Sequence, residues 1–73
     1  MPRRKVVSEV AGTVWKIEAP IGSRVEAEDT ILLIECMKME IPVYAPAAGT
    51  VAAIRVAEGE AVAEGQIVAE LES

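Results

Sequence analysis

Short apolar stretches separated by glycine and proline dominate the chain. Four segments have the length and the apolar pattern of β-strands, namely residues 12–17, 30–36, 51–56 and 67–71. Residues 19–23 and 58–60 contain glycine between such segments and predict turns. Several short strands at this spacing indicate a β-sandwich or a β-barrel.

A helix is the alternative for the middle of the chain. Asp29 or Thr30 could cap a helix over residues 30–40 with Pro42 as its stop, and periodicity alone does not decide for so short an apolar run. The composition favours strands, because 10 Val and 7 Ile outnumber 3 Leu. Branched side chains of this kind fit a pleated sheet better than a helix.

The sequence repeats itself at an offset of 37 positions. Residues 6–36 align with residues 43–73 without a gap, and nine of the 31 positions are identical, whereas roughly two or three matches are expected by chance. The identities cluster in the Ala-Gly-Thr-Val segments at 11–14 and 48–51. Two copies are too few for a solenoid. The duplication therefore predicts one closed all-β unit with pseudo-twofold symmetry, in which residues 37–42 join the halves.

Length and charge predict a single small domain with a basic start. Arg3, Arg4 and Lys5 supply three of the seven cations, and we expect residues 1–5 to be flexible and residues 6–73 to form the domain. The domain holds the other four cations against 12 anions. Such an acidic body repels a phosphate backbone, so we expect no nucleic-acid partner.

Several kinds of chemistry are excluded by residue type. Without histidine, and with Cys36 as the single cysteine, the chain can form neither an internal disulfide, nor a structural zinc site, nor a Ser–His–Asp triad. No stretch of about 18 apolar residues and no charged-then-apolar leader is present, so we expect no membrane partner. A lone reduced thiol fits the cytoplasm, which is the location we expect.

The bridge at residues 37–42 has no counterpart in the aligned repeat and breaks a rule of turn chemistry. If the flanking apolar segments pair as a hairpin, its tip falls at Met37 and Lys38, although two-residue turns prefer Asn-Gly or Asp-Gly. A left-handed conformation at such a residue costs about 1–3 kcal/mol, and a broken local rule indicates function. Lys38 would project into solvent between Met37 and Met39, whose polarizable side chains could contact a partner. In the alternative interpretation Lys38 is an ordinary solvated turn residue and both methionines fill the core.

Two segments resemble the motifs of a known family. Glu-Cys-Met-Lys-Met-Glu at residues 35–40 resembles the biotin-attachment signature of biotin carboxyl carrier domains, and Ala-Pro-Ala-Ala-Gly-Thr-Val at 45–51 resembles their second motif. The resemblance covers nearly the whole chain. It implies a flattened β-barrel or sandwich of two four-stranded antiparallel sheets, with Lys38 as the modified lysine on an exposed hairpin and Met37 and Met39 as its recognition residues.

The resemblance also implies a carrier function. A biotin protein ligase would join biotin to Lys38, and the arm would carry a carboxyl group between a biotin carboxylase and a carboxyltransferase, as in acyl-CoA carboxylases. The domain itself would be non-catalytic, monomeric on its own and without a metal. Two departures stand out: Cys36 replaces the usual alanine, and the short connection between residues 17 and 31 leaves no room for the protruding thumb of some bacterial carriers.

Three other functions are compatible with these residues. A lipoyl carrier shares the fold and the hairpin lysine, although it usually has Asp-Lys-Ala, and one small domain could accept both biotin and lipoate. An unmodified interaction module of the same fold would not need Lys38. An enzyme is disfavoured, since Cys36 is the sole candidate nucleophile and no histidine can activate it.

The two aromatic residues receive no function from the sequence. We expect Trp15 to be a half-buried sheet residue, and its position in the repeat corresponds to Ala52. Tyr44 follows Pro42 closely, which predicts a sheet edge or a bulge, because proline cannot donate a hydrogen bond to a neighbouring strand.

Overall fold

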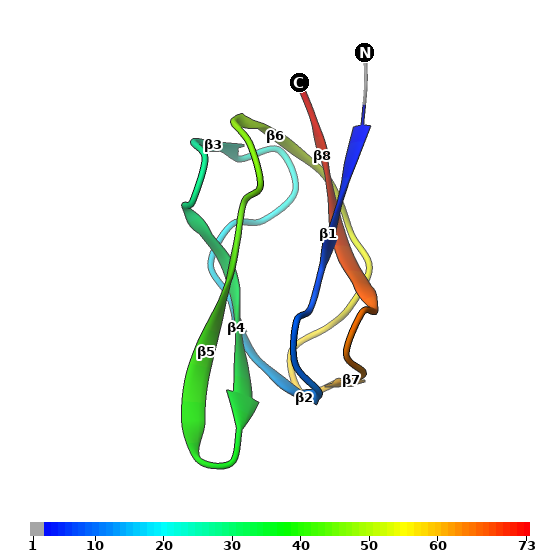
Figure 1. The fold of residues 1–73 in the computed structure, drawn as a ribbon. Helices are drawn as coiled ribbons and strands as arrows, with labels where there is room; N and C mark the ends of the chain where they lie inside the picture. The colour runs from blue at the N-terminus through cyan, green and yellow to red at the C-terminus, as the bar shows by residue number, and fades with distance from the viewer. Residues whose placement is uncertain (1–2) are drawn as a thin grey trace.

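The computed structural model describes residues 3–73, which form eight β-strands and no helix (Figure 1). The strands are β1 (Arg3–Val7), β2 (Gly12–Ile17), β3 (Arg24–Val25), β4 (Thr30–Cys36), β5 (Met39–Tyr44), β6 (Gly49–Ile54), β7 (Ala61–Val62) and β8 (Ile67–Glu72). They build two four-stranded antiparallel sheets, ordered β1-β8-β6-β3 and β5-β4-β2-β7. The predicted all-β fold is therefore confirmed, and the helix considered for residues 30–40 is wrong. In this part of the chain no helix could cross a membrane.

The two sheets are related by the repeat. At the offset of 37, β5 corresponds to β1, β4 to β8, β6 to β2 and β7 to β3. Replacing each strand by its counterpart converts the strand order of one sheet into that of the other. The registers agree as well, because the pair Glu35–Glu40 on β4 and β5 corresponds at the offset of 37 to the pair Glu72–Arg3 on β8 and β1. The pseudo-twofold duplication is therefore a property of the fold as well as of the sequence.

The turns of each half bind to the other half. The amide of Gly22 donates a hydrogen bond to the carbonyl of Val51 at 2.8 Å, and the equivalent amide of Gly59 donates to the carbonyl of Val14 at 2.7 Å. The short strands follow the same rule: β3 pairs with β6, and β7 pairs with β2. Because these backbone groups find their partners only across the repeat, the two halves must fold together.

The core lies between the sheets and is almost entirely aliphatic. Val14 and its counterpart Val51 are each 1 % exposed, and Ile31, Leu32 and Ile34 of β4 are fully buried. The molecule is elongated, with extents of 36 × 17 × 17 Å. Figure 1 shows the β4–β5 hairpin at one end of the long axis, and the start of β1 and the end of β8 at the other.

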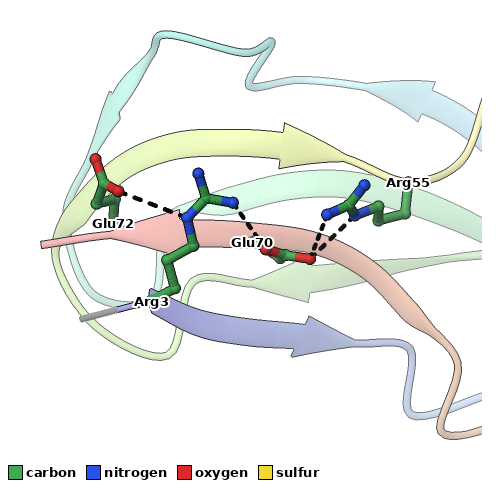
Figure 2. Close-up of polar contacts among 4 residues, drawn as sticks. All are labelled: Arg3, Arg55, Glu70 and Glu72. Carbon is green, nitrogen blue, oxygen red and sulfur yellow. Dashed lines mark hydrogen bonds and ion pairs between the residues drawn. The ribbon is translucent and has the colours of Figure 1, made fainter. Parts of the chain in front are cut away.

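The expectation of a flexible start is wrong for residues 3–5, which belong to β1 and pair with β8. Arg3 also forms ion pairs with Glu70 at 3.1 Å and with Glu72 at 3.5 Å (Figure 2). Hydrogen bonds of the backbone ladder and these charge pairs hold a segment whose polar sequence gave no strand signal. Residues 1 and 2 lie outside the described part of the chain.

The bridge between the halves is also shorter than the aligned repeat indicated. Because β1 pairs with β8 as β5 pairs with β4, residues 40–42 correspond to residues 3–5. Only the tip of the bridge, around Met37 and Lys38, has no counterpart among the described strands. The feature that the duplication does not account for is thus the turn itself.

Candidate functional site

The β4–β5 hairpin ends in a two-residue turn. Cys36 and Met39 are its last paired residues, and Met37 and Lys38 lie between them. Both turn residues have positive φ angles, 53° at Met37 and 66° at Lys38. This is the geometry of a type I′ turn, whose twist matches that of two antiparallel strands.

The turn stores strain, as its sequence predicted. A left-handed conformation costs an ordinary residue about 1–2 kcal/mol, and neither Met37 nor Lys38 is one of the residues that adopt it easily. The alternative in which the methionines fill the core is wrong, because Met37 is 89 % exposed and Met39 is 61 % exposed. Two exposed methionines therefore flank Lys38 on a turn that the backbone disfavours.

Lys38 offers an accessible amine. Its side chain is exposed, and none of the ion pairs within residues 3–73 includes it. An amine in this position can enter the active site of another protein, because no part of the fold surrounds it. The hairpin thus presents a primary amine at the extreme end of the molecule.

A pair of carboxylates lies one residue pair behind this turn, and the sequence alone assigned no function to it. Glu35 and Glu40 are cross-strand partners, and both are exposed. Like charges placed opposite each other destabilise a sheet by about 0.2–1 kcal/mol. The signal was available, since a two-residue turn at Met37 and Lys38 brings residues at equal distances from its centre into register.

The remaining sequence candidates are simpler. Cys36 is partly buried and has a free thiol. Residues 3–73 contain no cluster of three acidic or cysteine side chains that could hold a metal ion. Trp15 is 48 % exposed, and Tyr44 is 56 % exposed on β5, an edge strand of its sheet, so both predicted placements are confirmed.

Comparison with known proteins agrees with this geometry. The model of the biotin/lipoyl family, which is described as "Biotin-requiring enzyme", matches residues 5–71. The chain belongs to the biotin/lipoyl attachment family. This attachment domain is 36 % identical over 63 residues to the biotin/lipoyl attachment protein of Bacillus subtilis strain 168, and the match covers 86 % of each chain. It is 34 % identical over 64 residues to the biotinylated protein TB7.3 homolog of Mycobacterium leprae, covering 88 % of this chain and 90 % of that one.

The attachment domain also matches part of a much larger protein. The crystal structure of the Kluyveromyces lactis urea carboxylase superimposes with a TM-score of 0.93 at 36 % identity, and the match covers 99 % of this chain but 6 % of that chain. The same fold therefore occurs both in small proteins and as one short segment of a much longer carboxylase chain.

Proposed function

We propose that this attachment domain is a biotin carboxyl carrier and that Lys38 is its attachment residue. The observation that carries the proposal is the exposed amine of Lys38 on a strained turn at one end of the fold. The family supports biotin as the group, and Lys38 is the one lysine of residues 3–73 that lies in a turn rather than in a strand. Lys16, by comparison, lies within β2 and forms an ion pair with Glu18 at 3.6 Å.

Attachment requires a biotin protein ligase that presents biotin as an activated acyl group, such as an acyl phosphate ester. The Nζ atom of Lys38, after losing a proton, attacks the acyl carbon, an amide bond forms, and the phosphate-containing group departs. The product is neutral, so the hairpin loses one positive charge. Met37 and Met39 provide apolar, adaptable contacts for the ligase beside this amine.

The carrier role follows from the tether. When attached, biotin supplies a ureido nitrogen that holds a carboxyl group, and the domain contributes position rather than catalysis. A hairpin at the extremity of the fold lets the arm reach a carboxylase and then a carboxyltransferase. Tethering raises the local concentration of the carried group at both sites. We propose a non-catalytic, monomeric domain in the cytoplasm, in line with the expectations from the sequence.

Mass spectrometry tests the attachment. The purified protein is incubated with biotin, ATP and a biotin protein ligase, and the intact mass and the fragment masses locate the added group. We expect one biotinyl increment on Lys38 and none in Lys38→Arg, whose melting temperature should match that of the wild type. Lys16→Arg is the matched control and should be modified normally. An unmodified wild type, or an increment on another lysine, would contradict the proposal.

Lipoate is the second candidate, because one similar small protein is named for both groups. The same hairpin amine could accept a lipoyl group through an equivalent amide. Incubation with a lipoate ligase in a parallel sample distinguishes the two. A lipoyl increment on Lys38 together with the biotinyl one would indicate a dual carrier, and a lipoyl increment alone would replace the biotin proposal.

A further inference from the structure

The repeat makes the outer faces of the two sheets structurally equivalent, but their chemistry differs. On the β1-β8-β6-β3 sheet, Glu70 accepts hydrogen bonds from Arg55 at 2.8 and 3.0 Å and from Arg3 at 3.1 Å (Figure 2). Leu33 occupies the equivalent position on the β5-β4-β2-β7 sheet, and Pro42 is its cross-strand partner. The β1-β8-β6-β3 face therefore has a hydrogen-bonded carboxylate at this position, whereas the β5-β4-β2-β7 face has the partly buried Leu33 and Pro42. Lys16 of β2 lies on the other side of Leu33 and pairs with Glu18 at 3.6 Å.

Four apolar or aromatic side chains lie on the outer face of this second sheet. Leu33 lies between Leu32 and Ile34, which are both fully buried, so its side chain is on the outer face. Pro42 pairs with it, and Tyr44 lies two residues further along β5 on the same side. Trp15, at a bulge of β2, is exposed beside the neighbouring strand. We call this surface the aromatic face; its members are Trp15, Leu33, Pro42 and Tyr44.

A carboxylate pair borders the aromatic face toward the Lys38 turn. Glu35 and Glu40 lie two residue pairs closer to the turn than Leu33 and Pro42, and none of the ion pairs within residues 3–73 includes either carboxylate. The equivalent row on the other sheet contains Glu72 with its ion-pair partner Arg3. Arg3 therefore lies opposite Glu72 on one sheet, whereas a second carboxylate, Glu40, lies opposite Glu35 at the equivalent position of the other sheet.

We infer that the aromatic face and the Glu35–Glu40 pair form the docking surface for a biotin carboxylase, and that this enzyme presents an apolar patch beside arginine or lysine side chains. The inference rests on the proposed function of Lys38. Tryptophan and tyrosine are the residue types that contribute most to protein–protein affinity, and exposed apolar patches with a polar rim mark such interfaces. Charge complementarity defines the rim, because two uncompensated carboxylates attract basic side chains.

The extent and the charge of this surface select its occupant. Tyr44 lies roughly 15–20 Å along β5 from the turn, at about 3.4 Å per residue, so a partner that contacts both must bind the body of the domain and the hairpin together. An enzyme docked there meets the carrier in every turnover, with the Lys38 arm projecting past the carboxylate pair into its active site. A second copy of this chain is disfavoured, because its formal net charge is −5 and it would bring further carboxylates to an acidic rim.

Charge reversal at Glu40 tests the inference without weakening the fold. Glu40→Arg places a cation opposite Glu35, as Arg3 stands opposite Glu72 on the other sheet, so the variant should be at least as stable as the wild type. Glu72→Arg is the control, because it makes the same change in charge at the position equivalent to Glu35. Trp15→Ser with Tyr44→Ser tests the apolar part, and Ile21→Ser, which removes an apolar side chain that is 63 % exposed in a turn, is its control.

All variants are first biotinylated on Lys38 and then titrated with the purified biotin carboxylase subunit encoded in the same genome. We expect Glu40→Arg to raise the KM for the carrier about tenfold and to reduce its dependence on salt, with kcat little changed. We expect the Trp15 and Tyr44 double variant to raise KM by about tenfold or more. Both controls should behave as the wild type in this assay, and every variant should keep a folded circular dichroism spectrum.

Four results would overturn the inference. In the first, test variants and controls change KM equally, so that no particular face is used. In the second, only the ligase step slows, which would assign the surface to the ligase. In the third, sedimentation shows a wild-type dimer that the Trp15 and Tyr44 double variant abolishes, so that a second copy covers the face. In the fourth, wild-type Lys38 is not biotinylated, which removes the carrier function itself and is recognised before any titration.

Discussion

The β4–β5 hairpin and the β8–β1 strand pair are the same structure used in two ways. They occupy equivalent places in the repeat, but the hairpin is closed by a turn, whereas β8 and β1 meet where the chain ends (Figure 1). The terminal pair carries the complementary charges Arg3 and Glu72, and the hairpin carries two carboxylates at the equivalent row. Because the backbone geometry is shared, these differences are not required by the fold. Positions that depart from their counterparts at a cost in stability are therefore the positions where function should be sought.

The largest expected effect comes from two equivalent glycines, Gly12 of β2 beside the hairpin and Gly49 of β6 beside the terminal pair. A Cβ atom on Gly12 would overlap the carbonyl oxygen of Glu35 and lie 2.7 Å from Cγ2 of Ile34, whereas one on Gly49 would lie 2.9 Å from the carbonyl oxygen of Glu72. We expect Gly12→Ala to lower the free energy of unfolding by about 3 kcal/mol and Gly49→Ala by about 1–2 kcal/mol. Urea denaturation of both variants measures the difference.

An equal loss of unfolding free energy in both variants would mean that the two sheets tolerate an added Cβ atom equally. This result would contradict the observation that β2 approaches β4 more closely than β6 approaches β8. In a domain of this size each kcal/mol corresponds to about 4–8 °C in melting temperature. Thermal melting is therefore an independent check on the order of the two variants.

The second effect concerns the strained turn. Asparagine adopts positive φ angles more readily than methionine, so Met37→Asn should raise the free energy of unfolding by about 1 kcal/mol. It should also slow biotinylation of Lys38, because it removes an apolar contact for the ligase. The rate is measured by intact mass against time, and normal biotinylation of the variant would show that Met37 is not a recognition residue.

Glu28 provides the matched control for strain. Its φ angle is 72°, and its counterpart in the repeat is Gly65 with a φ angle of 84°. Glu28→Gly should therefore also stabilise the protein, by about 0.5–1 kcal/mol, but it should leave the rate of biotinylation unchanged. A difference between the two variants would separate the strain of the turn from the recognition of its side chain.

Most of the fold could be predicted from the sequence, because the signals were local or repeated. The ranges of β2 and β4 followed from apolar pattern, and the duplication predicted the pseudo-twofold arrangement. The sequence placed a strand at 51–56, two residues beyond β6, since alanine gives a weak strand signal. The two-residue strands β3 and β7 are too short for any periodicity, and they form because they pair across the repeat.

The candidate site also has parts that the sequence could predict and parts that it could not. Lys38 and its methionines could be found from sequence, because poor turn chemistry and the motif lie in consecutive residues. The aromatic face could not, since Trp15, Leu33 and Tyr44 belong to three different strands and meet only through register. The difference between the Glu35–Glu40 pair and the Arg3–Glu72 pair becomes visible only when the strand register of both sheets is known.

The third prediction concerns a variant that gives the hairpin the same pair of charges as the β8–β1 strand pair. Glu40→Arg removes a like-charge contact and adds an opposite-charge one with Glu35, so we expect a gain of about 0.5–1 kcal/mol in the free energy of unfolding at low salt. The gain should shrink as salt increases. Glu40→Gln, which only removes the repulsion, should give a smaller gain. Equal gains from both variants would show that no ion pair forms across the hairpin.

The smallest effect is a change in pH dependence on the other sheet. Hydrogen bonds from Arg55 and then from Arg3 hold the pKa of Glu70 below its usual value of 4.5. A carboxylate with a lowered folded pKa contributes stability that is fully present above its unfolded pKa and is lost as the pH falls through its folded pKa. Glu70→Gln should therefore be slightly less stable than the wild type above pH 4.5, and the difference should diminish as the pH falls below that value. Leu33, its counterpart, has no charge to titrate, so Leu33→Met should run parallel to the wild type at every pH. A Glu70→Gln curve that also runs parallel would mean that the two arginines contribute nothing through this carboxylate, and the contrast between the faces would then be one of polarity alone.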